Sequence, residues 1–303
     1  MVAKSAEKRN RSLDNNPFWA NALIYLVLTA LSLITLLPMV NVLAFSFSEA
    51  RAIYDNPLML FPHDFTTAAY TYIFSTPALL KAFGITVYVT VTGTLLNLLF
   101  TVTGAYGLSK TNIPGHRFLL WWTIVPMLFG AGLIPFYLLL KELHLINSLW
   151  AMILPGLVAP FNLILMRNFF WSIPDELEEC VKIDGATEWT ALTRIILPLS
   201  KPAIATIALF YAVGHWNDYF NGLFFLTDNG KWPLQVLLRS IIIDMSALNM
   251  RGTNLGQDVT KVILTPENIK SATIVFSIVP ILVVYPFLQR YFVKGIMMGA
   301  VKG

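Results

Sequence analysis

The chain has 303 residues, of which 56% are hydrophobic and only 13% are charged; its formal net charge is +4 and its mean hydropathy is +0.65. Soluble domains are about half apolar, so this composition excludes an ordinary water-soluble protein and indicates a lipid environment. The single cysteine, Cys180, excludes an internal disulfide. Because the sequence has no repeat, low-complexity stretch or segment the size of a soluble domain, we expect one membrane domain over residues 1–303.

Uncharged stretches divide the chain into six candidate membrane spans. Four of them, at 15–48, 82–109, 118–140 and 143–166, contain 34, 28, 23 and 24 residues between charges, and each exceeds the roughly 20 residues that cross a bilayer core. A fifth has 16 uncharged residues from Pro202 to Asp218, and a sixth has 19 between Lys270 and Arg290. The apolar runs are continuous rather than alternating, which predicts an all-α bundle of six helices and not a β-barrel.

Six spans place both termini on the same side of the membrane. Assigning the termini and the loops 109–117 and 167–201 to the cytoplasm puts 13 of the 21 Lys and Arg residues inside and 8 outside. The positive-inside rule favours this orientation. The first apolar stretch is about twice the length of a signal-peptide core, so we expect it to be retained as an anchor.

Prolines recur within the predicted spans, and each removes a backbone hydrogen bond and favours a kink. Two interpretations stay open: a set of bendable helices for alternating access, or the ordinary proline content of membrane helices. The residues are Pro126, Pro135, Pro155, Pro160, Pro280 and Pro286. In the long outer loop 227–270, the run that begins Trp232-Pro-Leu predicts one surface helix.

The segment between Arg167 and Lys201 holds six of the seventeen acidic residues. We expect two short helices here, the first capped by Ser172 and carrying acids near its positive end. Gly185 should end the first helix, and the second should run over 188–196. Trp189, Leu192, Ile195 and Ile196 then share one apolar side at helical spacing. The alternative is a solvated charge cluster without a partner.

These residues resemble the cytoplasmic signature of the permease subunits of binding-protein-dependent ABC importers. That signature runs Glu-Ala-Ala, three residues, Gly, nine residues, Ile, one residue, Leu-Pro. Glu179, Gly185, Ile195 and Leu197-Pro198 occupy its fixed positions at the same spacing. Cys180 and Val181 replace the two alanines, and both are small to medium apolar residues that a packed helix accommodates.

The resemblance implies that the first loop helix inserts into a groove on a separate cytoplasmic ATPase. The residues implied in this coupling are Glu178, Glu179, Cys180, Val181, Asp184, Gly185 and Ala186. The sequence has no Gly-x-x-x-x-Gly-Lys phosphate loop, so ATP and Mg²⁺ are expected on the partner ATPase subunits. We expect this chain to be a transport subunit and not an enzyme, with no catalytic residue, cofactor or metal site of its own.

Further segments resemble the sugar-importing branch of the same family. They are Phe61-Pro-His-Asp-Phe-Thr-Thr-Ala-Ala-Tyr70, Trp216-Asn-Asp-Tyr-Phe220, Gln289-Arg-Tyr-Phe-Val-Lys-Gly295 and Gly299-Ala-Val-Lys-Gly303. The resemblance is greatest to the second permease of importers for complex oligosaccharides and polysaccharide fragments. It implies a multi-pass protein of the bacterial plasma membrane with a second homologous permease, two ATPase subunits, an extracytoplasmic solute-binding protein and an oligosaccharide substrate, and no nucleic acid.

The end of the fifth span carries the candidate substrate path. Asp218 lies about 24 Å along a helix that begins at Pro202, near the outer edge of the hydrocarbon. Its neighbours Trp216, Asn217, Tyr219 and Asn221 are aromatic and amide types that stack on sugar rings and bind hydroxyl groups. An interfacial aromatic belt beside an acid that reaches toward water is an equal alternative.

Two other classes of protein remain as alternatives at this stage. An ion-gradient-driven secondary transporter of a polar solute calls for inverted repeats and intramembrane acids; the sequence shows no repeat and one suitable acid, Asp218. A membrane anchor or scaffold fits the spans but leaves the charged loop unexplained.

Overall fold

A computed structural model describes residues 18–56, 58–174, 176–183, 185–250 and 265–300. The chain divides into two compact units. The first unit comprises residues 1–72 and 255–275, and the second comprises 73–254 and 276–303. Within the described residues the regular structure is helical, apart from one isolated antiparallel bridge between Ser48 and Phe65. The predicted all-helical class is confirmed.

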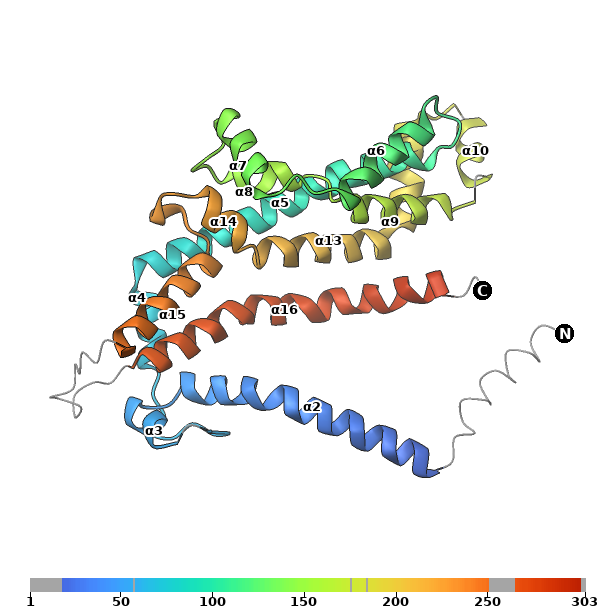
Figure 1. Ribbon diagram of the computed structural model, residues 1–303. Coiled ribbons are helices and arrows are strands. Elements are labelled where there is room, and N and C mark those ends of the chain that lie inside the picture. The colour runs from blue at the N-terminus through green and yellow to red at the C-terminus, as the bar shows by residue number, and fades with distance from the viewer. Residues whose placement is uncertain (1–17, 57, 175, 184, 251–264, 301–303) are drawn as a thin grey trace. The chain divides into compact units, whose positions relative to one another are not determined.

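The helices of the described residues are labelled in chain order in Figure 1. They are α2 (Phe18–Ser46), α3 (Ala50–Asp55), α4 (Ala68–Ser75), α5 (Pro77–Ser109), α6 (His116–Leu128), α7 (Leu133–Glu142), α8 (Trp150–Ile153), η1 (Leu154–Gly156), α9 (Pro160–Trp171), α10 (Glu176–Ile183), α11 (Glu188–Ala191), η2 (Leu192–Ile196), α12 (Leu197–Leu199), α13 (Lys201–Trp216), α14 (Phe220–Phe225), η3 (Asn229–Lys231), α15 (Leu234–Met250) and α16 (Pro266–Ala300). A helix is present after Trp232-Pro, as predicted, but α15 is amphipathic rather than confined to the surface, because Leu234, Val236 and Leu238 are buried.

By length and composition, three helices in the described part of the chain can cross a membrane: α2, α5 and the 267–284 part of α16. Three bent pairs raise this number to six if each pair counts as one span. They are α6 with α7, bent by 118°, the 150–156 segment with α9, bent by 46°, and the 188–199 segment with α13, bent by 83°. The predicted span over 118–140 is interrupted, because the chain breaks at Gly130-Ala-Gly132, where Gly132 has a φ of +78°.

The prolines divide into two groups by their position in the helices. Pro126 lies inside α6, and Pro280 and Pro286 lie inside α16. By contrast, Pro155 and Pro160 occupy the first turn of η1 and of α9. A missing N–H has no consequence in a first turn, so these two prolines begin helices rather than bend them.

In the first unit, polar side chains join the end of α2 to the start of α16. The Asn268 amide nitrogen donates to the carbonyl oxygens of Phe45 at 2.9 Å and Ser48 at 2.8 Å. The Tyr70 hydroxyl donates to the Ser46 Oγ at 2.9 Å. The two Asn268 bonds supply donors to carbonyl oxygens at the end of α2 and just beyond it, where a helix ends without partners for its last carbonyl groups.

In the second unit, α5 is the central helix and packs along α13 and α9 (Figure 1). Its buried residues Val102, Ala105 and Tyr106 share one core with side chains of α9, η2 and α13. Those side chains are Leu163, Met166, Phe170, Leu192, Ile196, Ile207 and Tyr211. Because η2 belongs to the charged loop, the loop is built into the core of the bundle.

Buried polar side chains close the break between η1 and α9. The Asn97 amide nitrogen donates to the carbonyl oxygens of Gly156 at 2.5 Å and Leu157 at 3.0 Å. The Tyr211 hydroxyl accepts the N–H of Ala159 at 3.0 Å. In a bilayer core each backbone polar group needs a partner within the protein. Asn97 on α5 and Tyr211 on α13 therefore permit the interruption of the helix between η1 and α9 within the predicted span 143–166.

Candidate functional site

The charged loop forms the predicted pair of short helices. α10 begins at Glu176 and ends at Ile183, and Gly185 follows with a φ of +79°, a left-handed conformation that favours glycine. Thr187 caps α11, because its hydroxyl accepts the N–H of Thr190 at 3.3 Å. The expectation that Ser172 caps the first helix is wrong. The Ser172 hydroxyl donates at 2.7 Å to the carbonyl oxygen of Phe169, in the last turn of α9.

The second loop helix differs from the predicted one in two respects. It is α-helical only over α11 and becomes π-helical in η2 before α12. Leu192 and Ile196 are buried in the core and Ile195 is partly buried against it, as predicted, but Trp189 is 62% exposed. Trp189 lies in the first turn of α11, ahead of the π-helical turn that enters the core. The predicted apolar side is therefore shorter than expected.

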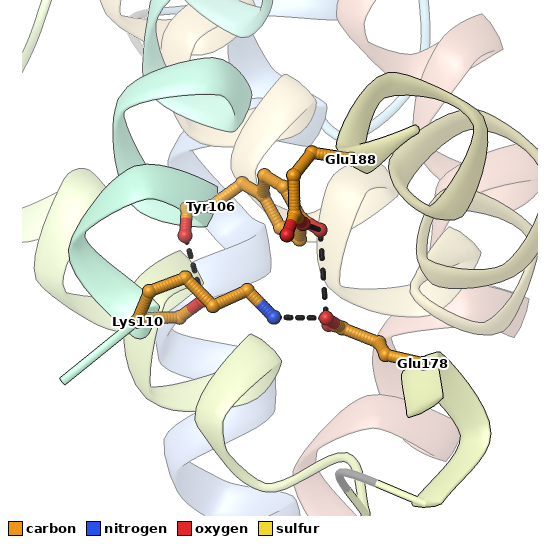
Figure 2. Close-up of polar contacts among 5 residues, drawn as sticks. Tyr106, Lys110, Glu178 and Glu188 are labelled. Carbon is orange, nitrogen blue, oxygen red and sulfur yellow. Dashed lines mark hydrogen bonds and ion pairs between the residues drawn. The ribbon is translucent and has the colours of Figure 1, made fainter. Parts of the chain in front are cut away.

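Two acids of the loop converge on the last turn of α5 (Figure 2). Glu178 on α10 is 7% exposed and forms an ion pair with the Lys110 ammonium group. The Tyr106 hydroxyl donates to the Glu188 carboxylate at 2.7 Å and lies 3.5 Å from the Glu178 carboxylate. The Lys110 ammonium nitrogen also lies 4.8 Å from the centroid of the Tyr106 ring. One acid on each side of Gly185 is thus bound to the same turn of α5.

The opposite side of α10 is exposed. Glu176, Glu179 and Ile183 are spaced so that they share one helical face, and all three are exposed, Ile183 by 85%. Gly185 is also exposed, and Ala186 is partly buried. Two other predicted coupling residues, Cys180 and Val181, lie within α10, and Asp184 lies outside the described residues. This face mixes charge with an exposed apolar side chain, as interaction surfaces do.

Tyr106 and Lys110 were not among the predicted site residues. In the sequence, Lys110 marks only the boundary of the second span. A signal was nevertheless present, because the predicted orientation places residues 109–117 and 167–201 on the same side of the membrane. A basic residue at the end of one span and a cluster of acids in the neighbouring loop are complementary. The sequence alone does not indicate which acid pairs with Lys110.

The predicted substrate-path residues do not converge on one site. Asp218 accepts hydrogen bonds from the backbone and side-chain nitrogens of Asn221, at 3.2 and 2.9 Å. The Asn217 amide donates to the Val213 carbonyl oxygen at 3.0 Å. Tyr219 stacks edge-on against Phe220. Asp218 therefore stabilises the turn before α14, and its carboxylate is bound to Asn221.

Trp216 faces the interior of the second unit. It is buried, and its indole N–H donates to the Ser277 carbonyl oxygen at 3.1 Å. It lines an apolar cavity of about 180 Å³ together with side chains of α5, α13 and α16. Within the described ranges, no group of three or more His, Cys, Asp or Glu residues is arranged to hold a metal ion.

Comparison with known proteins places the charged loop in a defined family. The family model of the binding-protein-dependent transport system inner membrane component matches residues 109–298. The chain belongs to this family. The match contains the whole loop, including Gly185 and Leu197-Pro198, so the predicted family is confirmed. The family is one of membrane transport components, and the membrane location of the chain follows from it.

Individual relatives in this family align along most of the chain. Protein LplC of Bacillus subtilis (strain 168) is 46% identical, over 92% of this chain and 93% of its own. The polygalacturonan/rhamnogalacturonan transport system permease protein YtcP of the same organism is 43% identical, over 93% and 97%. A chain in the crystal structure of a bacterial ABC transporter that imports the acidic polysaccharide alginate is similar with a TM-score of 0.83, at 32% identity and over 91% and 100% of the two chains.

Proposed function

We propose that this chain is the permease subunit of an ATP-driven importer that moves oligosaccharides or polysaccharide fragments into the cytoplasm of a bacterium. The observation that carries the proposal is the two-helix loop, whose core-facing side is bound to α5 and whose outer face is exposed. Family membership supports the transport role. The names of YtcP and of the alginate transporter support saccharides as the substrate class.

The proposed topology has six spans, of which three are bent. Each bent pair then counts as one crossing, and both termini and the loop lie on the cytoplasmic side. The distribution of Lys and Arg supports this orientation, with 13 inside and 8 outside of 21. It places the exposed face of α10 in the cytoplasm, where an ATPase subunit has access to it.

The proposed complex has five kinds of component besides the lipid: this chain, a second homologous permease, two ATPase subunits, an extracytoplasmic solute-binding protein and the saccharide. ATP and Mg²⁺ bind to the ATPase subunits, which close when nucleotide binds. This chain then transmits movement. The exposed Glu179 and Ile183 on α10 would contact the ATPase, with charge-assisted hydrogen bonds from the carboxylate.

The contacts behind α10 determine how that movement spreads. Glu178 and Glu188 join the loop to Lys110 and Tyr106 on α5. Leu192 and Ile196 join it to the core shared by α5, α9 and α13. A force on α10 therefore acts on a packed unit and not on a loose loop, because close-packed interiors transmit strain. Glu178 is therefore a positioning residue, which holds α10 against α5 through its ion pair with Lys110.

The test is uptake of a labelled oligosaccharide into proteoliposomes that contain this chain with its partner permease and ATPase subunits. We expect uptake that needs ATP and loaded binding protein and persists when ionophores remove ion gradients. Uptake that follows an imposed ion gradient without ATP contradicts the proposal and favours the secondary transporter. Absence of uptake by the assembled complex favours a scaffold.

A further inference from the structure

Asn147 holds two loops of the second unit together. One loop, 143–149, follows α7, and the other, 226–233, follows α14. The Asn147 N–H donates to the Phe225 carbonyl oxygen at 2.7 Å, and its side-chain oxygen accepts the N–H of Asp228 at 3.1 Å. Its own carbonyl oxygen accepts a hydrogen bond from the Lys231 ammonium group at 2.7 Å. Asn147 has a φ of +61°, a less common backbone conformation, and these three groups bind the end of α14 and the loop that follows it.

An open recess of about 380 Å³ lies beside this junction. It is lined by Tyr88 of α5, by the 147–149 segment, by Trp150 at the start of α8 and by Lys231. The two aromatic side chains come from different helices, and each is at least 40% exposed. The recess therefore combines two aromatic groups, a fixed ammonium group and an accessible opening.

Lys231 is the charged group of the recess and is oriented before any ligand arrives. Its ammonium group donates one hydrogen bond to Asn147, which leaves two of its three N–H donors for other partners. A lysine that is already held in place loses less side-chain entropy when it binds an anion. An oxyanion is thus the chemical group that this recess is suited to accept.

We propose that the recess is a subsite for an acidic saccharide, with Lys231 bound to a uronate carboxylate and Tyr88 and Trp150 in contact with the sugar rings. The inference rests on the proposed function, because the proposed topology puts the loops after α7 and α14 on the extracytoplasmic side. Aromatic surfaces fit the apolar faces of sugar rings, and an ammonium group fits a carboxylate. The saccharide named in YtcP, polygalacturonan, carries one carboxylate per galacturonate unit, and alginate is named as acidic.

A lipid headgroup is the other source of an oxyanion near such a recess, because aromatic residues and lysines also gather at membrane interfaces. We favour the saccharide because the Lys231 ammonium group is held by the Asn147 carbonyl oxygen of the neighbouring loop, beside the two aromatic side chains of the recess. The experiment separates the two sources by lipid composition.

The experiment measures saccharide binding to the assembled transporter in nanodiscs of phosphatidylcholine, without the solute-binding protein, by saturation-transfer NMR. The probes are oligogalacturonate and oligomannuronate of three to five units, each with its fully methyl-esterified form as the uncharged match. We expect wild type to bind the acidic probes better than the esters. Lys231→Gln should weaken acidic binding about tenfold and leave ester binding unchanged, since a hydrogen bond to a charged group is lost.

Three further variants serve as controls. Lys231→Arg keeps the charge and should retain most of the preference for acid. Lys270→Gln removes the same charge from an exposed lysine on α16 that does not line the recess, and should not alter the preference for acid. Trp150→Leu should weaken the acidic and esterified probes alike, because it removes ring contact and no charge. Each variant is compared at equal amounts of assembled complex after gel filtration.

The proposal is overturned if wild type binds neither acidic probe, if Lys231→Gln changes acid and ester equally, or if Lys270→Gln has the same effect as Lys231→Gln. Displacement of the probes by added phosphatidylglycerol, lost in Lys231→Gln, assigns the recess to a lipid headgroup and also overturns it. Stimulation of ATP hydrolysis by loaded binding protein is measured on the same wild-type sample. Stimulation without probe binding refutes the subsite alone, whereas absent stimulation refutes the proposed function.

Discussion

The ion pair between Lys110 and Glu178 gives the most quantitative prediction. Breaking a fully buried pair by neutralising one partner costs about 3–5 kcal/mol, because a charge remains buried without its counterion. The side chains here are 21% and 9% exposed, so water screens part of this loss. We therefore expect Glu178→Gln to destabilise the docked position of α10 by about 2 kcal/mol, which lowers the ratio of docked to undocked loop about 30-fold.

This loss should appear in coupling and not in membrane insertion. The assay compares ATP hydrolysis and saccharide uptake in the same proteoliposomes, with loaded binding protein present. Glu178→Gln and Lys110→Gln should each lower the uptake per ATP hydrolysed. Glu142→Gln, which removes an exposed acid at the end of α7, is the matched control and should behave as wild type.

The exchanged pair Lys110→Glu with Glu178→Lys provides the decisive comparison. It restores opposite charges, so uptake per ATP should recover in part relative to either single exchange. Recovery is incomplete because the new carboxylate at 110 lies near Tyr106, whose hydroxyl is bound to Glu188. If both single neutralisations couple as wild type does, or if the double exchange is worse than the sum of its parts, the reasoning about this pair is refuted.

Three further predictions concern the bundle and the outer face of α10. Asn97→Leu leaves the carbonyl oxygens of Gly156 and Leu157 without their donor. This should reduce the free energy of unfolding by about 1–3 kcal/mol and so lower the thermal midpoint of the purified complex. An unchanged midpoint contradicts the role of Asn97. Gly93→Ala places a methyl group 2.5 Å from the His215 Nε2, so it should reduce the yield of folded protein, whereas Gly84→Ala, with no atom within 4 Å, should not. Glu179→Arg reverses an exposed charge and should abolish pull-down of the ATPase with normal insertion; retained pull-down places the contact elsewhere.

Much of the architecture was predictable from local properties of the sequence. The lengths of the uncharged runs predicted the long helices α2, α5 and α16, because a bilayer-spanning helix needs a long apolar stretch. The acids near the start of the loop, the glycine at Gly185 and the helical spacing of the apolar residues after it predicted two helices with a turn at Gly185. Its positive φ explains why glycine is favoured there, since most other residues are strained in that conformation.

Other features depend on contacts between distant segments and were not predictable. The 118° bend between α6 and α7 follows from backbone geometry at Gly132, and the apolar run alone does not reveal it. The inward direction of Glu178 depends on the place of Lys110, 68 residues earlier in the chain. Trp189 has helical spacing with Leu192 and is exposed, because the π-helical turn begins after it.

The same limit applies to the end of α13. The sequence grouped Trp216, Asp218 and Asn221 as one polar and aromatic cluster. In the structure Trp216 is buried with its N–H bound to Ser277, while Asp218 and Asn221 bind each other. Residue type indicated polar chemistry at this point, but a turn of the chain between α13 and α14 separated the side chains.

The measurement that tests the central claim most directly is the stimulation of ATP hydrolysis by saccharide-loaded binding protein, in liposomes that hold this chain with its partner permease and ATPase subunits. Wild type is compared with Gly185→Val and Gly185→Asn. A Cβ at Gly185 meets no atom within 4 Å, so both side chains have space in the chain. The two variants differ in how well they adopt the φ of +79° found at this position, because asparagine tolerates that conformation and valine does not. We predict stimulation in wild type, most of it in Gly185→Asn and little in Gly185→Val. Equal stimulation in all three, or none in a correctly assembled wild-type complex, contradicts coupling through this loop.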